Sequence, residues 1–431
     1  MAMHAAVIGG GISGLASAFH LAERGHRVTL FEGEGYLGGL GTTFPFRDGH
    51  LERFYHCILP NDDALVRLIR AVGLGDELLW RGTDMGFMYR RQVYPLNTPG
   101  DLLRFSPLSI LDRLRLGLMA VRTRFGGLDP RLDRVAVGDW IRSMIGERAF
   151  EILWKPMLMA KLGDSYTGIP ALWLSSRMNR EKNTERETKG CLRRGYRSLI
   201  DAFESSLRSR GAEIMLNTRV EAIERDCEGM ALALDPGGRR AFDLVVSTSP
   251  LIQFRRMTAS LEIPQKVRDL DLDYQGVVSG VFLLEKPLSR YYWMPIVDSG
   301  ATCQGVIEMS NLVPLERSDG LYVTYLVNYT HRSSELFGRS DEDLLAVYRR
   351  DLAELFPDAG RTVVDQFVFR APFVEPIWTL GYSEAKPPFS IIPGRLYMSS
   401  TAQLYPMVNS WNSCCDTVER MMKELNAEVP A

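Results

Sequence analysis

The stretch VIGGGISG, residues 7–14, decides the fold of this chain. Its glycines Gly9, Gly11 and Gly14 follow the spacing G-x-G-x-x-G, which is typical of a dinucleotide-binding turn. In such a turn Gly9 permits the tight bend, Gly11 lets the backbone approach a pyrophosphate, and Gly14 lets the next helix pack against the preceding strand. The motif alone is a weak signal, so the residues on both sides decide whether it has this meaning.

The flanking residues supply the strand, turn, helix and strand that the motif requires. Residues 5–8 predict an apolar strand, residues 15–25 predict a helix that stops at a glycine, and a second strand ends at Glu32. We expect the first helical N–H groups, at Ile12 and Ser13, to face the phosphates, because a helix N-terminus carries partial positive charge. Glu32 lies about 20 residues after the loop, where a carboxylate accepts hydrogen bonds from ribose hydroxyls and repels the extra phosphate of NADP.

The composition is that of an ordinary globular protein. The chain has 431 residues, of which 45% are hydrophobic, and its formal net charge of -2 gives no reason to expect nucleic acid as a partner. The six cysteines form no C-x-x-C pair, so neither a disulfide framework nor a metal site is expected. No apolar run reaches the ~20 residues of a membrane span and no signal peptide is evident, so a cytoplasmic protein is predicted. The oligomeric state is left open.

A second pair of glycines, Gly38 and Gly39, lies in GEGYLGGLGTTF, residues 33–44. With it the chain resembles the flavoprotein superfamily of amine oxidases, protoporphyrinogen oxidases, phytoene desaturases and UDP-galactopyranose mutases. In that superfamily the doublet follows the ribose carboxylate and lies against FAD, so the resemblance implies FAD as the cofactor. Leu40 stands where the superfamily often has an arginine, and the hydroxyl of Thr42 or of its neighbour is expected to take over.

A later stretch, residues 189–224, extends the resemblance. It predicts a helix over about 196–210 and then a strand reaching Val220, which in the superfamily meets the adenine side of FAD through its backbone. A turn at residues 235–238 joins two further strands. The second of these strands ends near Thr248, at the carboxyl edge where open α/β sheets hold ligands.

The last stretch, residues 394–425, predicts a strand, a polar loop and a final helix. In the superfamily this segment closes the fold over the flavin ring. Thr401 stands in place of part of the usual Gly-Asp pair, and Val408 and Asn409 replace small residues before the final helix. The resemblance therefore places these three residues at the cofactor.

Together these patterns predict an α/β fold. It consists of a Rossmann-type FAD-binding domain with an inserted helical cap and an antiparallel β-sheet substrate domain. The FAD-binding segments are expected at 1–54, 189–271 and 365–431, the helical cap at 55–188 and the antiparallel sheet at 272–364.

Two features between the FAD segments leave alternatives open. A predicted cap helix at residues 106–125 places apolar residues on one face and most arginines elsewhere: Leu108, Leu111, Leu114, Leu118 and Val121, with Arg113, Arg115, Arg122 and Arg124. It is either a solvated outer face of the cap or a peripheral contact with a membrane surface or lipid-linked substrate. Tyr325 and Tyr329, on one face of a predicted strand, either line the substrate pocket or pack in the sheet.

The substrate-side residues leave the chemistry open. Amine oxidases commonly carry a lysine on a sheet strand beside the flavin, and here Ser279 or Gly280 takes its place, which argues against amine oxidation. His56 is a candidate catalytic residue because its pKa near neutrality suits moving one proton, with a backbone-bonded structural histidine as the alternative. Arg177 is a candidate clamp for an anionic group, with an ordinary salt bridge of the cap as the alternative.

These features predict an FAD-dependent oxidoreductase that takes a hydride from a C–N or C–C bond of a small organic substrate onto the flavin. One alternative is a non-redox sugar-nucleotide mutase that resembles UDP-galactopyranose mutase and uses reduced flavin as a nucleophile. Another is a non-catalytic flavin-binding protein.

Overall fold

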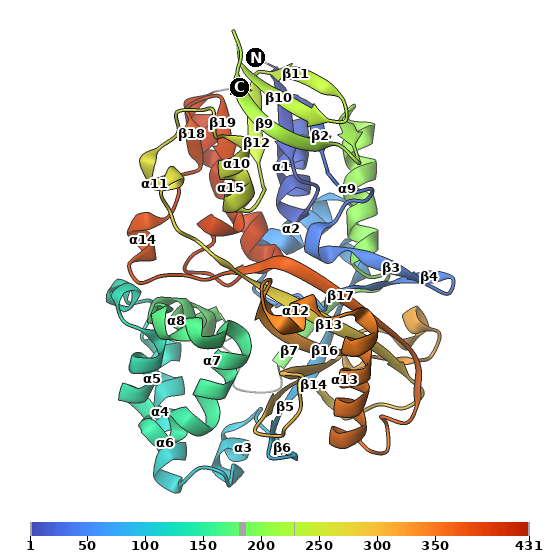
Figure 1. Cartoon of the computed structure of the whole chain (residues 1–431), viewed down its shortest axis with the longest axis vertical. Helices are drawn as coiled ribbons and strands as arrows, with labels where there is room; N and C mark the ends of the chain where they lie inside the picture. The colour runs from blue at the N-terminus through green and yellow to red at the C-terminus, as the bar shows by residue number, and fades with distance from the viewer. Residues whose placement is uncertain (1, 181–186, 228, 430–431) are drawn as a thin grey trace.

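The computed structural model describes residues 2–180, 187–227 and 229–429. A six-stranded sheet forms one half of the molecule, in the order β18-β19-β12-β1-β2-β8 (Figure 1). Its pairs are parallel except for β18 with β19, and its central strands are apolar runs because both faces of the sheet are covered. The strands are β1 (His4–Ile8), β2 (Arg27–Phe31), β8 (Glu213–Met215), β12 (Leu244–Ser247), β18 (Ser390–Ile392) and β19 (Leu396–Met398).

Four helices pack around this sheet: α1 (Ile12–Glu23), α2 (Asp63–Ala71), α9 (Tyr196–Ser209) and α15 (Trp411–Glu428). The predicted helices at 15–25 and about 196–210 and the predicted final helix are confirmed. The single strand expected to reach Val220 is instead two strands, because Asn217 adopts a φ of 51° that no strand residue has. The second of them starts a three-stranded antiparallel sheet of β9 (Arg219–Arg225), β10 (Met230–Asp235) and β11 (Gly238–Phe242).

An eight-stranded sheet forms the core of the other half, in the order β17-β13-β16-β15-β14-β5-β6, with β7 paired to β5. The predicted antiparallel strands between 272 and 335 are confirmed. The strands are β5 (Leu78–Tyr89), β6 (Gln92–Pro95), β7 (Glu187–Leu192), β13 (Tyr274–Leu284), β14 (Tyr291–Val297), β15 (Gly305–Glu308), β16 (Tyr322–His331) and β17 (Val363–Pro376).

Two of the expected domain boundaries differ from this arrangement. The sheet recruits β5 and β6 from the range expected to be a helical cap, because Arg90 and Arg91 adopt positive φ and turn the chain into a hairpin. The boundaries at 188/189 and 364/365 fall inside β7 and β17, and both strands belong to the eight-stranded sheet.

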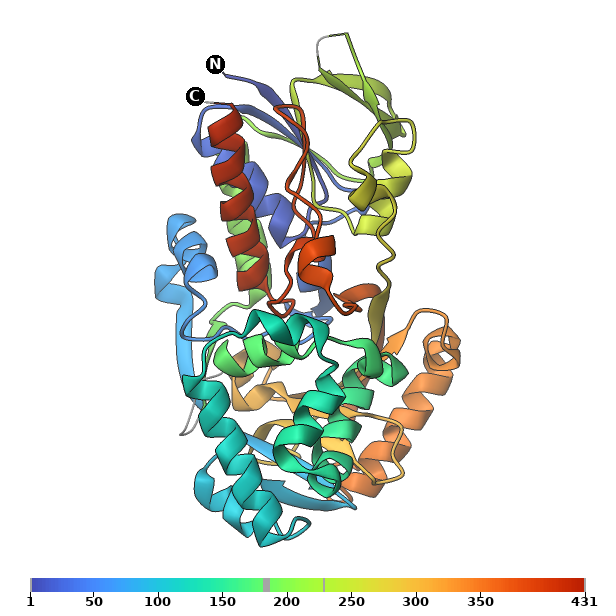
Figure 2. The ribbon, with the colours of Figure 1, turned by 90° about the vertical axis from the view of Figure 1, so that its left-hand side faces the viewer.

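The cap itself is helical and lies at the end of the molecule far from both termini (Figures 1 and 2). Its elements are α3 (Pro99–Arg104), α4 (Ile110–Phe125), α5 (Val137–Ile145), α6 (Glu147–Ala149), α7 (Lys155–Leu162) and α8 (Ala171–Arg180). A longer helix, α13 (Asp341–Leu355), packs on the eight-stranded sheet. The remaining short elements are β3 (Thr43–Phe46), β4 (Gly49–Glu52), α10 (Leu251–Met257), α11 (Gln265–Arg268), α12 (Glu335–Gly338) and α14 (Tyr382–Ala385).

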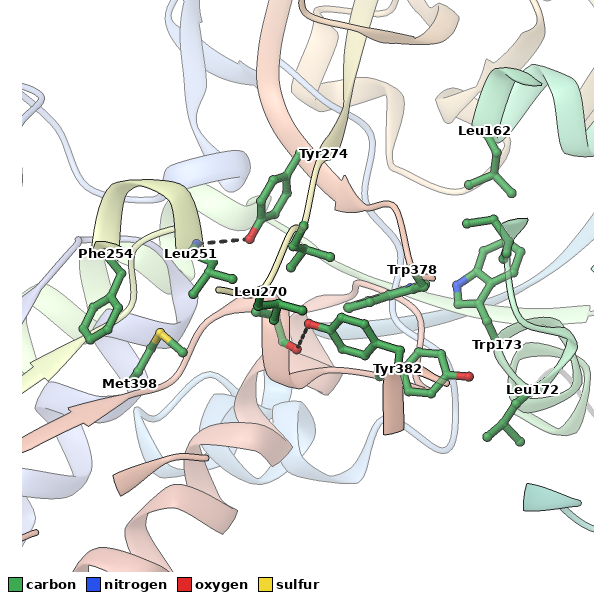
Figure 3. Close-up of a cluster of buried hydrophobic side chains, with 14 of the residues drawn as sticks. Leu162, Leu172, Trp173, Leu251, Phe254, Leu270, Tyr274, Trp378, Tyr382 and Met398 are labelled. Atoms are coloured by element: carbon green, nitrogen blue, oxygen red, sulfur yellow. Dashed lines mark hydrogen bonds between the residues drawn. The ribbon is translucent and has the colours of Figure 1, made fainter. Parts of the chain in front are cut away.

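One buried apolar cluster joins the two halves (Figure 3). Trp173 of α8 and Trp378, which follows β17, belong to it together with Met398 of β19. Of its polar atoms, the Tyr274 hydroxyl accepts from the Leu251 N–H at 3.1 Å, whereas the buried indole nitrogens of Trp173 and Trp378 have no hydrogen-bond partner among the described residues. The cluster fixes the cap against the six-stranded sheet.

A buried ion pair adds a second connection between the halves. The Arg317 Nη2 lies 2.7 and 2.8 Å from the two carboxylate oxygens of Glu52, whose exposed fraction is 2%. Glu52 Oε1 also accepts from the Tyr196 N–H at 3.1 Å, at the start of α9. The pair therefore ties β4 to both the nucleotide-binding half and the eight-stranded sheet.

Candidate cofactor and substrate site

The two glycine loops lie directly against each other at the carboxyl ends of β1 and β2. Gly11 and Gly38 pair in a parallel bridge, and a Cβ added to Gly39 would stand 3.0 Å from the Gly11 Cα. A Cβ added to Gly14 would lie 1.8 Å from the carbonyl oxygen of Gly9, so α1 can pack this closely on β1 only with glycine there. The loops form a surface of bare backbone beside the N-terminus of α1.

A cavity of about 850 Å³ is lined by these loops, by the eight-stranded sheet and by the cap. Ligand sites in proteins are roughly 300–1,000 Å³, so its size suits a large cofactor together with part of a substrate. Most of the residues expected at the site line it: Gly9, Gly11, Ile12, Ser13, Glu32, Gly38, Gly39, Leu40, His56, Arg177, Val220, Thr248, Thr401, Val408 and Asn409.

Two of the expected residues, Gly14 and Thr42, do not line the cavity. Gly14 has the packing role described above, which is the role that its place in the motif predicts. Thr42 is buried beside Gly38, and its carbonyl accepts from the Arg53 N–H at 3.0 Å. Thr42 thus lies behind the lining of the cavity, and a hydroxyl bond from it or its neighbour to the cofactor stays a prediction.

Glu32 stands at the end of β2, where its carboxylate closes the first loop. Its Oε2 accepts from the Gly10 N–H at 2.7 Å and its Oε1 accepts from the Glu34 N–H at 2.9 Å. These bonds fix both carboxylate oxygens at the wall of the cavity. Each oxygen can accept a second hydrogen bond, so the carboxylate remains able to hold a ribose diol.

The remaining cofactor-side residues come from the carboxyl ends of distant strands. The Thr248 hydroxyl donates to the Ile8 carbonyl at 2.9 Å and so ties the end of β12 to β1. The side chain of Asn409 donates to the carbonyl of Val374 and so ties the turn before α15 to β17. The bare loops and the fixed carboxylate fit an adenine dinucleotide bound with its pyrophosphate at the start of α1.

His56 lies between two aromatic rings at the cavity wall. Its ring centroid is 5.3 Å from that of Tyr196 and 5.5 Å from that of Trp411. Its Nδ1 lies 2.9 Å from the Phe54 carbonyl oxygen, which can only accept, so Nδ1 carries the proton and Nε2 keeps its lone pair. Burial lowers the pKa of His56 below its ordinary value, so the ring is neutral at pH 7. The histidine is thus bonded to backbone and also faces the cavity.

Four polar side chains form a cluster on the substrate side of the cavity. The Lys161 Nζ lies 3.3 Å from a carboxylate oxygen of Glu375 and 4.1 Å from the ring centroid of Tyr329. The hydroxyl of Tyr329 is 2.7 Å from that of Tyr55. All four side chains line the cavity, and the charge of Arg177 acts on both tyrosines. Burial raises the pKa of each tyrosine, so both hydroxyls stay protonated.

The sequence did not bring Lys161 and Glu375 together. They lie on α7 and β17, far apart in the chain, and only the fold makes them neighbours. One signal was available, because Glu375 interrupts the apolar run FVEPIW at 373–378, where a carboxylate is costly unless it is paired.

The structure separates the alternatives that the sheet strands left open. Ser279 lines the cavity, whereas a Cβ added to Gly280 would meet Tyr348 of α13 on the opposite face of the sheet. The buried Ser279 hydroxyl has no hydrogen-bond partner among the described residues. Tyr325 is packed in the sheet, where its hydroxyl donates to the Glu52 carbonyl at 2.7 Å, and only Tyr329 lines the cavity.

Comparisons with known proteins agree with this geometry. The family model described as flavin containing amine oxidoreductase matches residues 12–377. A 15-cis-phytoene desaturase of Capsicum annuum is 22% identical over 82% of this chain and 64% of its own length. A protein described as a zeta-carotene desaturase of Synechococcus elongatus is 30% identical over 37% of this chain and 38% of its own length. The chain thus spans less than two thirds of the length of these curated relatives.

The fold is shared with solved flavoprotein structures. A protein from Exiguobacterium described as a protoporphyrinogen oxidase superposes with a TM-score of 0.77 over 99% of both chains, at 19% sequence identity. At that identity the superposition shows a common fold, while the family model covers most of the chain, from the glycine loop to β17. The chain therefore belongs to the flavin-containing amine oxidoreductase family, and its cofactor is FAD.

Proposed function

We propose that this chain is an FAD-dependent oxidoreductase that oxidises a small organic substrate at a C–C bond in preference to a C–N bond. The observation that carries the proposal is one cavity lined both by the two glycine loops and by the cluster of Lys161, Glu375, Tyr55 and Tyr329. A cofactor on the loops would share its chamber with whatever contacts this cluster. The proposed function requires such a shared chamber, because hydride transfer needs the two reactants in contact.

We assign the holding of FAD to the expected residues that line the cavity. The pyrophosphate would lie against Gly11 and Gly39, where no side chain separates it from the backbone, and Glu32 would accept from the ribose hydroxyls. The wall of the site would be completed by Val220, Thr248, Thr401, Val408 and Asn409. When bound, FAD supplies the acceptor for a hydride.

Ser279 supports oxidation at carbon. It occupies the strand position at which the resemblance places the lysine of amine oxidases, and its short hydroxyl faces the cavity. A serine cannot carry the positive charge or the reach of that lysine. The desaturases among the relatives act, by their names, on phytoene and zeta-carotene, so we propose an apolar substrate with an oxidisable C–C bond.

His56 is the candidate for the proton that leaves the substrate when a C–C bond becomes a double bond. Its Nε2 is unprotonated at pH 7 and its Nδ1 is held by the Phe54 carbonyl, so the ring can take up one proton without turning. Lys161 is the candidate positioning residue, because its ion pair with Glu375 and its contact with the Tyr329 ring hold the substrate-side wall. For Arg177, a clamp on an anionic group stays a prediction.

The test is anaerobic mixing of the FAD-loaded protein with candidate substrates while the oxidised flavin band is followed. We expect phytoene or zeta-carotene, delivered in detergent micelles, to bleach the band and a primary amine to leave it unchanged. His56→Gln is expected to slow bleaching without loss of bound flavin. Lys161→Met is expected to slow it as well, whereas Lys155→Met, on the same helix but paired with the exposed Glu151, serves as the matched control.

Two results would overturn the proposal. Bleaching by amines alone would assign the protein to oxidation at C–N bonds. The mutase would be favoured if the photoreduced protein turned over UDP-galactopyranose while neither phytoene, zeta-carotene nor the amine bleached the oxidised flavin band. The cytoplasmic location also stays a prediction.

A further inference from the structure

The most apolar part of the molecular surface is concentrated on and around α4. Eight of the fifteen large hydrophobic side chains that are exposed among the described residues lie between residues 103 and 128. They are Leu103, Ile110, Leu111, Leu114, Leu118, Val121, Phe125 and Leu128, and we call them the α4 stripe. Phe125 is 77% exposed and Leu114 is 58% exposed, so these are not side chains that merely border the core. Such clustering marks an interaction surface.

The helix is packed on its other side, so the exposure is not a sign of a detached element. Leu116, Met119 and Thr123 are buried against the rest of the cap. The exposed apolar residues within the helix are spaced by three and four positions and therefore share one face: Leu111, Leu114, Leu118, Val121 and Phe125. A helix of a globular protein normally turns its wider apolar face inward, and α4 presents a second apolar face outward.

The sequence anticipated most of this face but not its full extent. Leu108 was expected on the same face, but it lies before the first turn of α4 and is buried. Ile110 and Phe125, at the two ends of the helix, extend the stripe instead. Figure 1 shows α4 at the end of the molecule opposite both termini, where a flat surface could approach it.

The exposed charges described on α4 are all positive. Arg115 and Arg122 are exposed, and Arg113 is held beside the stripe by bonds to the Leu108 and Leu103 carbonyls at 2.8 and 2.5 Å. The one acidic residue of the helix, Asp112, is buried in a capping box with Ser109. On α4 itself, apolar side chains are thus flanked by exposed arginines and by no exposed carboxylate, which complements an anionic lipid surface.

We propose that the α4 stripe docks onto the surface of a bilayer that contains anionic phospholipid, with α4 lying in the plane of the interface. No described helix is both long enough and apolar enough to cross a membrane, so the attachment would be peripheral. A second copy of the chain is a poorer occupant. Two-fold pairing would bring the arginines of one α4 against those of the other, with no exposed carboxylate on the helix to balance them.

The stripe is connected to the cavity through α8. The side chain of Asn179 donates to the carbonyl of Gly127, just after α4, at 3.3 Å. Arg177 and Arg180, on the same helix as Asn179, line the cavity. Docking would therefore place the cap wall of the cavity near the lipid. The docking itself stands whether or not the proposed reaction is right.

The experiment is flotation of the FAD-loaded protein with vesicles of phosphatidylcholine alone or with a quarter of phosphatidylglycerol. We expect binding to the anionic vesicles that weakens as salt is raised. The triple variant Leu114→Gln, Leu118→Gln and Val121→Gln should bind these vesicles roughly a hundredfold more weakly, because each wild-type side chain would enter the apolar phase. Val364→Gln with Leu380→Gln, two exposed apolar residues outside the stripe, is the matched control.

Flavin content and circular dichroism of each variant show whether it is folded, and Arg115→Gln with Arg122→Gln tests the charge separately. This pair should weaken binding to anionic vesicles while leaving the weak binding to neutral ones unchanged. The proposal is overturned if the wild type does not float with anionic vesicles, or if the control pair loses as much binding as the triple variant. It is also overturned if the protein is a dimer that the triple variant dissociates, since the stripe would then be a subunit interface.

Discussion

Replacing Glu52 by glutamine should destabilise the whole molecule, because Arg317 would lose its counter-charge. The side chains of Glu52 and Arg317 are 2% and 10% exposed, and both carboxylate oxygens lie within 2.8 Å of one guanidinium nitrogen. Removing one partner of a buried ion pair costs about 3–5 kcal/mol, since the remaining charge is left without compensation. Glutamine keeps the shape and can still accept from the Tyr196 N–H, so the loss isolates the charge.

Urea unfolding followed by tryptophan fluorescence would give the change in the free energy of unfolding. Asp201→Asn, which breaks the exposed pair with Arg197 on α9, is the control and should cost less than about 1 kcal/mol. The double variant Glu52→Leu with Arg317→Met should recover most of the loss, because it leaves no buried charge behind. A cost for Glu52→Gln as small as that of the control, or a double variant less stable than the single one, would refute the reasoning.

Three further predictions follow from the described contacts. Gly14→Ala should abolish flavin binding, because its Cβ would stand 1.8 Å from the Gly9 carbonyl oxygen. The control Gly117→Ala, on α4, places its Cβ where no atom lies within 4 Å and should retain flavin. Equal flavin absorbance in the two purified variants would contradict the prediction. The pKa of His56 is lowered by burial, so the unfolded chain takes up the proton first and stability should fall as pH drops below about 6.5. His56→Gln should make that fall shallower between pH ~8 and ~5.5, and an unchanged slope would count against it. Burial raises the pKa of Glu308 to about 7, so its folded form keeps a proton that the unfolded chain releases, and stability should fall as pH rises from about 4.5 to 7. The free energy of unfolding measured at pH 4.5 and at pH 7 should differ less for Glu308→Gln than for the wild type. An equal difference in the two proteins would be evidence against the raised pKa.

Local motifs carried most of the fold. The glycine loop, Glu32 and the Gly38-Gly39 doublet lie within one stretch of chain, and the contact that requires glycine at position 14, with the Gly9 carbonyl oxygen, is the one that the motif itself implies. The final helix and the turn at 235–238 were also predictable, because caps and turn residues act over a few positions. The structure places the glycine loops and the final helix at the six-stranded sheet, and the turn at 235–238 joins β10 and β11 of the three-stranded sheet.

The parts that the sequence could not give depend on contacts between distant residues. Lys161 and Glu375 form their ion pair only because the fold brings α7 and β17 together. The local sequence around either residue does not predict the other as its partner. Thr42 is a second case, since it follows the glycine doublet in sequence but is buried and is not among the residues that line the cavity. The direction of the α4 stripe was ambiguous for the same reason, because periodicity defines a face of a helix but not what that face meets.

The cavity is lined by residues from Ile8 to Cys414, which has a consequence for the order of events during synthesis. When the ribosome has made β1, β2 and their loops, the strand β12 that pairs with β1 does not yet exist, and β19 and α15 follow much later still. The edge of β1 that pairs with β12 therefore stays unpaired until the more than two hundred residues between them have been translated. FAD can be enclosed only after the start of α15 has been synthesised, so cofactor loading follows the synthesis of all three FAD-binding segments. A nascent chain arrested before that helix would be a flavin-free target for chaperones and proteases.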